Sequence, residues 1–433
     1  MSVAAVEAVW RIESARLVAG LARFTGDVGA AEELAQDALV AALEQWPTAG
    51  VPPNPGGWLM TTAKNRAVDG FRRAAVHRRA VETIGRDTAE AVDERDAVDD
   101  ALDDPVGDDV LRLLFTACHP ALSREYRIAL TLRCLSGLRT AEIGRAFLVP
   151  EPVAGQRISR AKKTLRDKGI RFAMPGPADV TERLASVLEV IYLVFNEGYS
   201  ATAGEDWMRP ELAAEALRLA RLTAVLLPAE PEAHGLAALL ELTQSRAAAR
   251  QDADGRPVLL QHQDRRRWDR LLIRRGLTAL ARAHDAGLTR PGPPPSAHPS
   301  PDGAIGPYTL QAAIAACHAT APSPAATDWA QIAGLYDVLA TAWPTPVVGL
   351  NRAMAHGRAF GADAGLALLD AVDAAALTGY PQLPAVRGEL LALAGRHAEA
   401  ADRFAEAAAL TRNGPERDLF AERAAEALAR VVG

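Results

Sequence analysis

Alanine dominates the apolar residues of this chain, and that choice constrains the fold more than any other feature of the sequence. Apolar residues make up 49% of the chain, but aromatic residues only 5%. Small side chains of this kind suit closely packed helices, whereas sheets favour valine, isoleucine and tyrosine. We therefore expect an all-α fold. At about 150 residues per domain, a chain of this length is expected to hold three domains.

Two strongly basic segments lie within an acidic protein. The net charge of −6 would ordinarily argue against a nucleic-acid partner. Yet residues 60–80 hold six lysines and arginines against one acid, and residues 124–171 hold twelve against four. Positive charge concentrated in this way is typical of a chain that touches phosphate at two places. The charge pattern therefore predicts two nucleic-acid-binding modules.

Composition divides the chain into four segments. Residues 1–84 are helical and end basic, residues 85–109 are strongly acidic, and residues 110–175 are helical and basic. Residues 176–433 form a helical array rich in alanine and leucine. The acidic run carries eleven acids against two arginines and repels itself, so we expect a mobile linker. A proline-rich stretch, residues 290–301, cannot continue a helix and predicts a long surface loop.

The helix expected from about Ala30 to Trp46 has two distinct sides. At about 100° per residue, one side is apolar and holds Leu34, Ala38, Leu39, Ala42, Leu43 and Trp46. The other side is acidic with an apolar residue in its middle, and holds Glu33, Asp37, Val40 and Glu44. This acidic side is either a docking stripe for a partner or a solvated helix face.

A second helix of this segment, residues 58–73, separates packing residues from basic ones. The residues expected to pack inward are Trp58, Leu59, Thr62 or Ala63, Val68 and Phe71. The residues expected to stay accessible are Lys64, Asn65, Arg66, Arg72 and Arg73. Cations on one side of a helix suit the phosphates of a nucleic acid, and Asn65 offers a polar edge beside them. Trp58 suits either a stacking platform or the core, and we favour the core.

Residues 140–165 have the pattern of a helix-turn-helix. Thr140 is expected to be the N-cap of the first helix, and Pro150 and Pro152 break it before a second helix. On the second helix, the residues expected to face the core are Ala154, Ile158, Ala161 and Leu165. The opposite side, offered to a major groove, holds Gln156, Arg157, Arg160 and Lys163. Arginine suits guanine and glutamine suits adenine through paired hydrogen bonds.

Together these motifs resemble the sigma-70 family, specifically ECF (extracytoplasmic function) RNA polymerase sigma factors. Asp27, residues 31–37 and residues 58–69 are similar to sigma region 2, and residues 140–165 are similar to region 4. The resemblance implies a core polymerase contact by Glu33, Gln36 and Asp37. It implies minus-10 contacts by Lys64, Asn65, Arg66, Arg72 and Arg73, and minus-35 contacts by Gln156, Arg157, Arg160 and Lys163. Residues 152–154 depart from the family, because they read ProValAla where many relatives carry GlyThrVal.

The spacing of the modules favours one function over two alternatives. A melting module, a flexible linker and a helix-turn-helix let one chain span two promoter elements, and tethering raises the local concentration of the second site. We therefore expect an initiation subunit of RNA polymerase with core polymerase and promoter DNA as partners. The main alternative is a helix-turn-helix regulator that acts without core polymerase. A third interpretation is a protein-interaction scaffold in which the DNA modules are secondary.

The carboxyl-terminal segment resembles the tetratricopeptide-like extension of one ECF group. Residues 390–410 place Gly395, Ala400 and Ala407 where two helices approach closely, with Phe404 as the large filler. The polar residues within its apolar stretches are Asn196, Glu197, Asp264, Trp268, Gln311 and Asn351. They either form hydrogen bonds between helices or line a binding concavity. We expect this extension to regulate the sigma modules, through intramolecular contact with them or through an unidentified ligand or protein.

Several other classes of protein are disfavoured. Charged residues interrupt the first apolar stretch, so we expect neither a signal peptide nor a membrane span, and a cytoplasmic location. Cys118 beside His119 is interpreted as packing rather than as a metal fragment. Nothing fixes His262, Asp264 and His284 as a hydrolytic cluster, and no catalytic motif is present. We expect no cofactor, no metal and no enzymatic activity.

Overall fold

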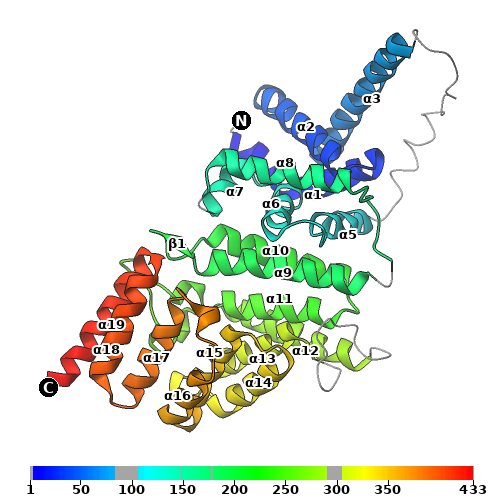
Figure 1. Ribbon diagram of the computed structural model, residues 1–433. Helices are drawn as coiled ribbons and strands as arrows, with labels where there is room; N and C mark the ends of the chain where they lie inside the picture. Colours follow the sequence, from blue (N-terminus) through cyan, green and yellow to red (C-terminus); the bar gives the residue numbers. More distant parts are fainter. Residues whose placement is uncertain (1–2, 83–105, 148, 177–178, 290–304, 433) are drawn as a thin grey trace. The chain divides into compact units, whose positions relative to one another are not determined.

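The computed structural model describes residues 3–82, 106–147, 149–176, 179–289 and 305–432 (Figure 1). The side chains of residues 69–82 and the proline-rich stretch 290–301 lie outside the description. The chain divides into two compact units, unit 1 (Met1–Val190) and unit 2 (Ile191–Gly433), which are described separately. The expected all-α fold is confirmed, because strand structure in the described residues is limited to one short pair.

Unit 1 contains two groups of helices that meet. Its helices are α1 (Val3–Thr25), α2 (Val28–Ala49), α3 (Pro55–Glu82), α5 (Val106–Ala117), α6 (Arg124–Cys134), α7 (Thr140–Ala146), α8 (Glu151–Asp167) and the first half of α9 (Val180–Tyr199). Helices α1, α2 and α3 pack on one another, as do α6, α7 and α8. Helix α5 packs against both α1 and α6, and α2 also contacts α8, so the two groups meet.

The first group is a three-helix bundle whose start and core follow from local chemistry. Asp27 caps α2, because its Oδ1 accepts a hydrogen bond from the backbone N–H of Ala30 at 2.9 Å. Trp46 is 2% exposed at the centre of the bundle, and its ring meets that of Trp58 edge to face with centroids 5.3 Å apart. Trp58 is half-buried, so the structure places it at the edge of the core rather than inside it.

The acidic segment ends earlier than the sequence predicts. Asp108 and Asp109 lie in α5, within the range expected to be a linker. Asp109 is 6% exposed, and its carboxylate binds Arg112 at 2.7 Å and Arg23 of α1 at 3.2 Å. The number of acidic residues does not identify the start of α5, because the burial of Asp109 depends on Arg23 from another helix. Residues 85–105 of the expected linker lie outside the described part of the chain.

The helix-turn-helix is formed by α7 and α8, with one correction at its start. Thr140 is the first residue of α7 rather than its N-cap. The backbone N–H of Arg139, the residue before α7, donates to the Glu142 carboxylate at 2.7 Å. The side chain of the third helical residue thus caps the start of the helix. Pro152 lies in the first turn of α8, where its missing N–H leaves no helical hydrogen bond unmade.

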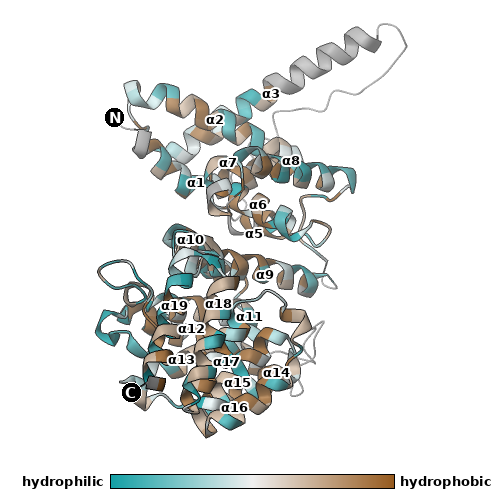
Figure 2. Ribbon diagram, turned by 60° about the vertical axis from the view of Figure 1, so that its left-hand side comes forward, coloured by the Kyte–Doolittle hydropathy of each residue, from teal (hydrophilic) through white to brown (hydrophobic). Residues whose placement is uncertain are grey.

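Unit 2 is an array of helices joined mostly by short turns. Its elements are the second half of α9, β1 (Ala203–Gly204), α10 (Pro210–Leu226), α11 (Pro231–Gln244), α12 (Arg270–Thr289), α13 (Pro307–Thr320), α14 (Trp329–Ala342), α15 (Pro346–Phe360), α16 (Ala362–Asp370), α17 (Gln382–Leu393), α18 (His397–Leu410), β2 (Arg412–Asn413) and α19 (Gly414–Val432). Short 3-10 helices lie at residues 247–249, 260–262, 265–267, 324–326 and 375–377. Successive helices from α10 to α19 pack as neighbours. Figure 2 shows hydrophobic and hydrophilic residues interspersed along these helices, as expected where one side is buried.

The helical pair expected at residues 390–410 is present as α17 and α18, although Gly395 has a different role from the one expected. Phe404 is 1% exposed and fills the space between the helices, and Ala400 and Ala407 are fully buried. Gly395 lies exposed in the turn with φ of 75°, a conformation that residues with a Cβ rarely adopt. The close approach occurs instead at Gly388, where an added Cβ would lie 2.9 Å from the Phe404 ring.

The end of unit 2 returns to its beginning. Strands β1 and β2 pair in parallel, with Ala203 opposite Arg412 and Gly204 opposite Asn413. The Asn413 side chain is buried and donates to the carbonyl oxygens of Ala201 at 3.1 Å and Asp206 at 2.9 Å. These bonds join residues more than 200 positions apart, so the helical array is closed by a specific contact.

Candidate functional site

Helix α2 presents the acidic side that the sequence predicts. Glu33, Asp37, Val40 and Glu44 are exposed, whereas Ala38, Ala42 and Trp46 are buried. Gln36 is partly exposed beside them. The three residues assigned to polymerase binding therefore lie on an accessible surface. Val40, 49% exposed within the acids, adds an apolar contact point to this surface.

This acidic surface is continuous with the predicted promoter-binding helix. The Arg66 guanidinium of α3 donates to the backbone oxygen of Asp37 at 2.7 Å and lies 3.7 Å from its carboxylate. Both side chains are partly exposed, so this ion pair contributes little stability. The ion pair instead fixes a position, because it holds Asp37 of the predicted polymerase contacts beside Arg66 of the predicted minus-10 contacts.

The remaining predicted residues of α3 differ in how far the structure describes them. Asn65 is exposed, and Lys64 is half-buried with its ammonium 5.9 Å from the centroid of the Phe24 ring. Burial lowers the pKa of Lys64, and the nearby positive charge of Arg23 lowers it further. The side chains of Arg72 and Arg73 lie outside the described residues, although both positions are on α3.

Helix α8 separates packing and accessible residues as predicted. Ala154, Ile158, Ala161 and Leu165 are buried, each at most 5% exposed. On the other side, Gln156, Arg160 and Lys163 are exposed, and Arg157 is partly exposed. Lys163 forms an ion pair with Asp167 one turn away, which leaves its ammonium on the solvent side of the helix. The accessible side carries both guanidinium and amide groups, which can read base edges.

A buried carboxylate that the sequence analysis missed joins the two groups of helices. Glu32 of α2 has a side chain that is 5% exposed and binds two cations. Arg133 of α6 donates from Nε to its Oε1 at 2.7 Å, and the Lys162 ammonium of α8 donates to its Oε2. Burial alone lowers the pKa of Lys162, but the Glu32 charge and hydrogen bond outweigh this and raise it. The signal in the sequence was a charged residue on the apolar stripe that begins with Val28.

Two further contacts hold the same groups together. Asp27, besides capping α2, accepts from Nε of Arg166 on α8 at 3.2 Å. Nε1 of buried Trp10 on α1 donates to the carbonyl oxygen of Gly137 at 3.0 Å, in the turn before α7. Lys162 and Arg166 on α8 thus face α2, while Gln156, Arg160 and Lys163 remain accessible.

Cys118 and His119 have structural partners. Cys118 is fully buried with its sulfur 3.2 Å from the Thr131 hydroxyl, and burial raises its pKa to about 12. His119 accepts a backbone hydrogen bond from Ala121 at 3.0 Å through Nδ1. In the part of the chain that the structure describes, no three His, Cys, Asp or Glu side chains gather as metal ligands would.

Some of the polar residues predicted in unit 2 make contacts between segments of the chain, and others are exposed. Glu197 is buried and binds Arg209 and the Thr202 hydroxyl, and the Gln311 side chain accepts from the Tyr192 hydroxyl at 3.2 Å. Asp264 caps a 3-10 turn, Trp268 is buried, and Asn196 and Asn351 are exposed. For Glu197 and Gln311 the contacts favour the structural interpretation.

Among the described helices, none is long and apolar enough to cross a membrane.

Comparison with known families assigns the two groups of unit 1 and part of unit 2. Residues 12–76 match Sigma-70 region 2, and residues 112–165 match Sigma-70 region 4. Residues 183–284 match a family of unknown function, DUF6596. Region 2 thus corresponds to α1–α3, and region 4 to α5–α8.

Two relatives are informative. An uncharacterized protein of Rhizobium meliloti (strain 1021), R00370, is 43% identical over 398 residues, covering 92% of this chain and 89% of the relative. The ECF RNA polymerase sigma factor SigL of Mycobacterium tuberculosis is 30% identical over 145 residues, covering 33% of this chain and 77% of SigL. No solved structure matches the chain. With regions 2 and 4 both present and SigL matched over most of its length, this chain belongs to the ECF family of RNA polymerase sigma factors.

Proposed function

We propose that the acidic side of α2 binds core RNA polymerase while α3 and α8 bind the two promoter elements. As a sigma factor, the chain has core polymerase and promoter DNA as its partners. The observation that supports the assignment of surfaces is accessibility. Glu33 and Asp37 are exposed on one helix of unit 1, and Gln156 and Arg160 are exposed on another.

Charge supports the division of labour between the surfaces. The α2 surface is acidic and holds one apolar residue, which suits a basic protein surface better than phosphate. The accessible side of α8 is basic with one amide and suits duplex DNA in the major groove. Asn65 on α3 offers a donor and an acceptor for the edge of an unpaired base.

The polymerase contact is tested with a charge-reversed variant and a matched control. Asp37→Arg places positive charge in the acidic surface, and Asp402→Arg makes the same change on an exposed position of α18. We expect Asp37→Arg to lower the affinity for purified core polymerase at least tenfold and Asp402→Arg to leave it unchanged. Equal affinities for the two variants would contradict the assignment of α2.

The promoter contacts are tested by separating duplex binding from strand opening. With core polymerase present, Arg160→Ala is expected to weaken upstream duplex binding by about 1–3 kcal/mol. Asn65→Ala is expected to leave that binding intact and to reduce permanganate reactivity of the opened strand. Arg171→Ala, an exposed position beyond α8, is the control for simple loss of charge. Loss of duplex binding in Asn65→Ala with normal opening would reverse the assignment.

We further propose that unit 2 regulates the activity of the sigma modules. Its support is size, because it is larger than unit 1 and has its own cores. Truncation after Ser200 retains α9, whose first half belongs to unit 1. Transcription from a promoter mapped with the full chain is expected to change in rate on truncation. An unchanged rate would reject a regulatory role, and duplex binding without core polymerase would favour the alternative regulator.

A further inference from the structure

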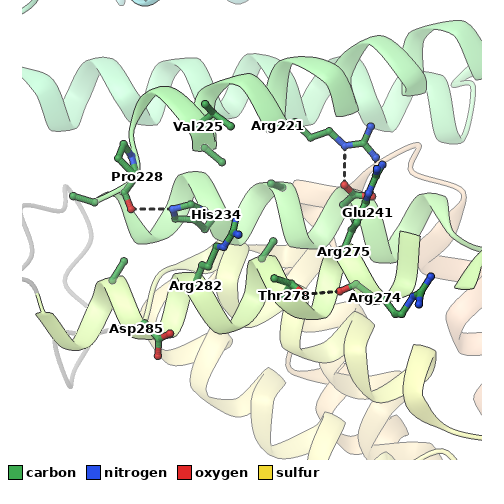
Figure 3. Close-up of a pocket in the computed structure, with 15 residues that line it drawn as sticks. Arg221, Val225, Pro228, His234, Glu241, Arg274, Arg275, Thr278, Arg282 and Asp285 are labelled. Atoms are coloured by element: carbon green, nitrogen blue, oxygen red, sulfur yellow. Dashed lines mark hydrogen bonds and ion pairs between the residues drawn. The ribbon is translucent and has the colours of Figure 1, made fainter. Parts of the chain in front are cut away.

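Unit 2 contains an open groove that none of the assigned functions uses. It lies between α10, α11 and α12 and has a volume of about 980 Å³ (Figure 3). Its lining combines alanines, a valine and a proline with four arginines, as follows: Ala224, Val225, Pro228, Ala229, Ala237, Ala279 and Ala286, with Arg221, Arg274, Arg275 and Arg282. The small side chains of its floor create the space, because alanine leaves room where leucine would fill it.

One side of the groove is positively charged beyond what the fold requires. Arg221 is compensated, since it makes two hydrogen bonds to the buried Glu241 carboxylate at 2.7 and 2.9 Å. Arg274, Arg275 and Arg282 are exposed on α12, and none forms an ion pair within the described part of the chain. Asp285 is the acid that α12 contributes to the lining. Three cations therefore face one carboxylate along this wall.

The opposite side of the groove is apolar. Val225, near the end of α10, is 73% exposed, and Pro228 and Ala229 continue the apolar surface into the following turn. His234 is 7% exposed, and its Nε2 is engaged with the carbonyl oxygen of Pro228 at 2.9 Å. This imidazole therefore fixes the turn. The groove thus has one cationic wall and one apolar wall.

The spacing of the arginines indicates the shape of an occupant. Arg275 and Arg282 are two helical turns apart, about 10 Å along the axis of α12. In Figure 3 both side chains reach from α12 toward α11, with Val225 and Pro228 beyond them. From Arg274 to Ala286 the lined part of α12 extends about 18 Å. A helix of three turns has this length, and its residues seven apart lie on one face with the same spacing as the two arginines.

We propose that this groove binds an acidic amphipathic helix of a protein partner. Carboxylates seven residues apart on the helix pair with Arg275 and Arg282, while apolar side chains on its other flank cover Val225 and the alanine floor. Helices bound in grooves are read through such recurring anchors, and arginine is enriched in protein interfaces. A nucleic acid would use the cationic wall but gain nothing from the apolar one. A small molecule would fill a fraction of the length.

The test selects peptides from a displayed library of amphipathic 16-residue helices, with the full-length protein as bait. Charge complementarity predicts that selected peptides carry Asp or Glu seven residues apart beside an apolar flank. Their affinity is expected to fall at least tenfold in the double variant Arg275→Glu, Arg282→Glu. Arg270→Glu, an exposed position on the same helix outside the groove, is expected to retain it. Unchanged circular dichroism establishes that the double variant folds.

Several results would overturn this proposal. Failure of the library to yield any peptide that distinguishes the wild-type protein from the double variant would do so. Selected peptides without acidic residues would do so as well. Displacement of a selected peptide by inorganic pyrophosphate or duplex DNA, at matched ionic strength and lower concentration than by the free peptide, would assign the groove to another ligand. The binding assay needs no polymerase, so its outcome is independent of the function proposed for unit 1.

Discussion

Removing the Glu32 carboxylate is expected to loosen the contact between sigma regions 2 and 4. Glu32→Gln keeps the size of the side chain but leaves Arg133 and Lys162 without their shared anion. Those side chains are only 14% and 13% exposed, so solvent compensates little of the loss. Breaking a buried ion pair by removing one partner costs about 3–5 kcal/mol. Because the amide of glutamine retains a hydrogen bond, we expect the lower end of that range.

Hydrogen exchange measures this cost where it arises. A loss of about 3 kcal/mol corresponds to roughly a hundredfold fall in protection, since each 1.4 kcal/mol is a factor of ten. Mass spectrometry follows the exchange in individual peptides. We expect the fall in protection in peptides from α6 and α8 and no change in peptides from unit 2. Asp167→Asn, which breaks the exposed pair with Lys163 on the same helix, is the control and should change protection by less than about 1 kcal/mol.

A double-mutant cycle separates the ion pair from unrelated effects of each substitution. Lys162→Met removes the second partner, and the double variant Glu32→Gln, Lys162→Met removes both. We expect the double variant to lose less stability than the two single losses added together, with a coupling of about 1–3 kcal/mol. A coupling below about 0.5 kcal/mol would place this contact among exposed ion pairs and refute the reasoning.

Three other predictions follow from individual positions. Gly198→Ala should lower the stability of unit 2 by about 1–3 kcal/mol, because its Cβ would meet the backbone of α10, whereas Gly334→Ala in an exposed helix interior should raise it by about 1 kcal/mol in the same denaturation assay. Iodoacetamide at pH 8 should label Cys317 slowly, because burial raises the pKa of this partly exposed thiol too, and should spare fully buried Cys118, whose pKa is about 12; mass spectrometry of the folded protein locates the label. Burial, reinforced by two neighbouring arginines, lowers the pKa of His318 from 6.5 to about 4, so unit 2 should lose stability as pH falls through this window, and thermal melts of His318→Gln should show a weaker dependence.

The sequence by itself determined the elements and the two sides of the exposed helices. The period of α8 separated Ala154 and Ile158 from Gln156 and Arg160 without reference to any other part of the chain. The acidic side of α2 followed in the same way. These features depend on residues a few positions apart, which the geometry of a helix places relative to one another.

Only the tertiary structure decided which charged residues are buried and what they bind. The position of Glu32 on an apolar stripe hinted at burial, but the sequence did not show that Arg133 pairs with it, nor that Arg23 pairs with Asp109. The groove between α10, α11 and α12 likewise depends on three helices meeting, because no single helix shows that its arginines border an apolar floor. The free energy of such contacts depends on the distance between groups far apart in the chain, and only the folded structure sets that distance.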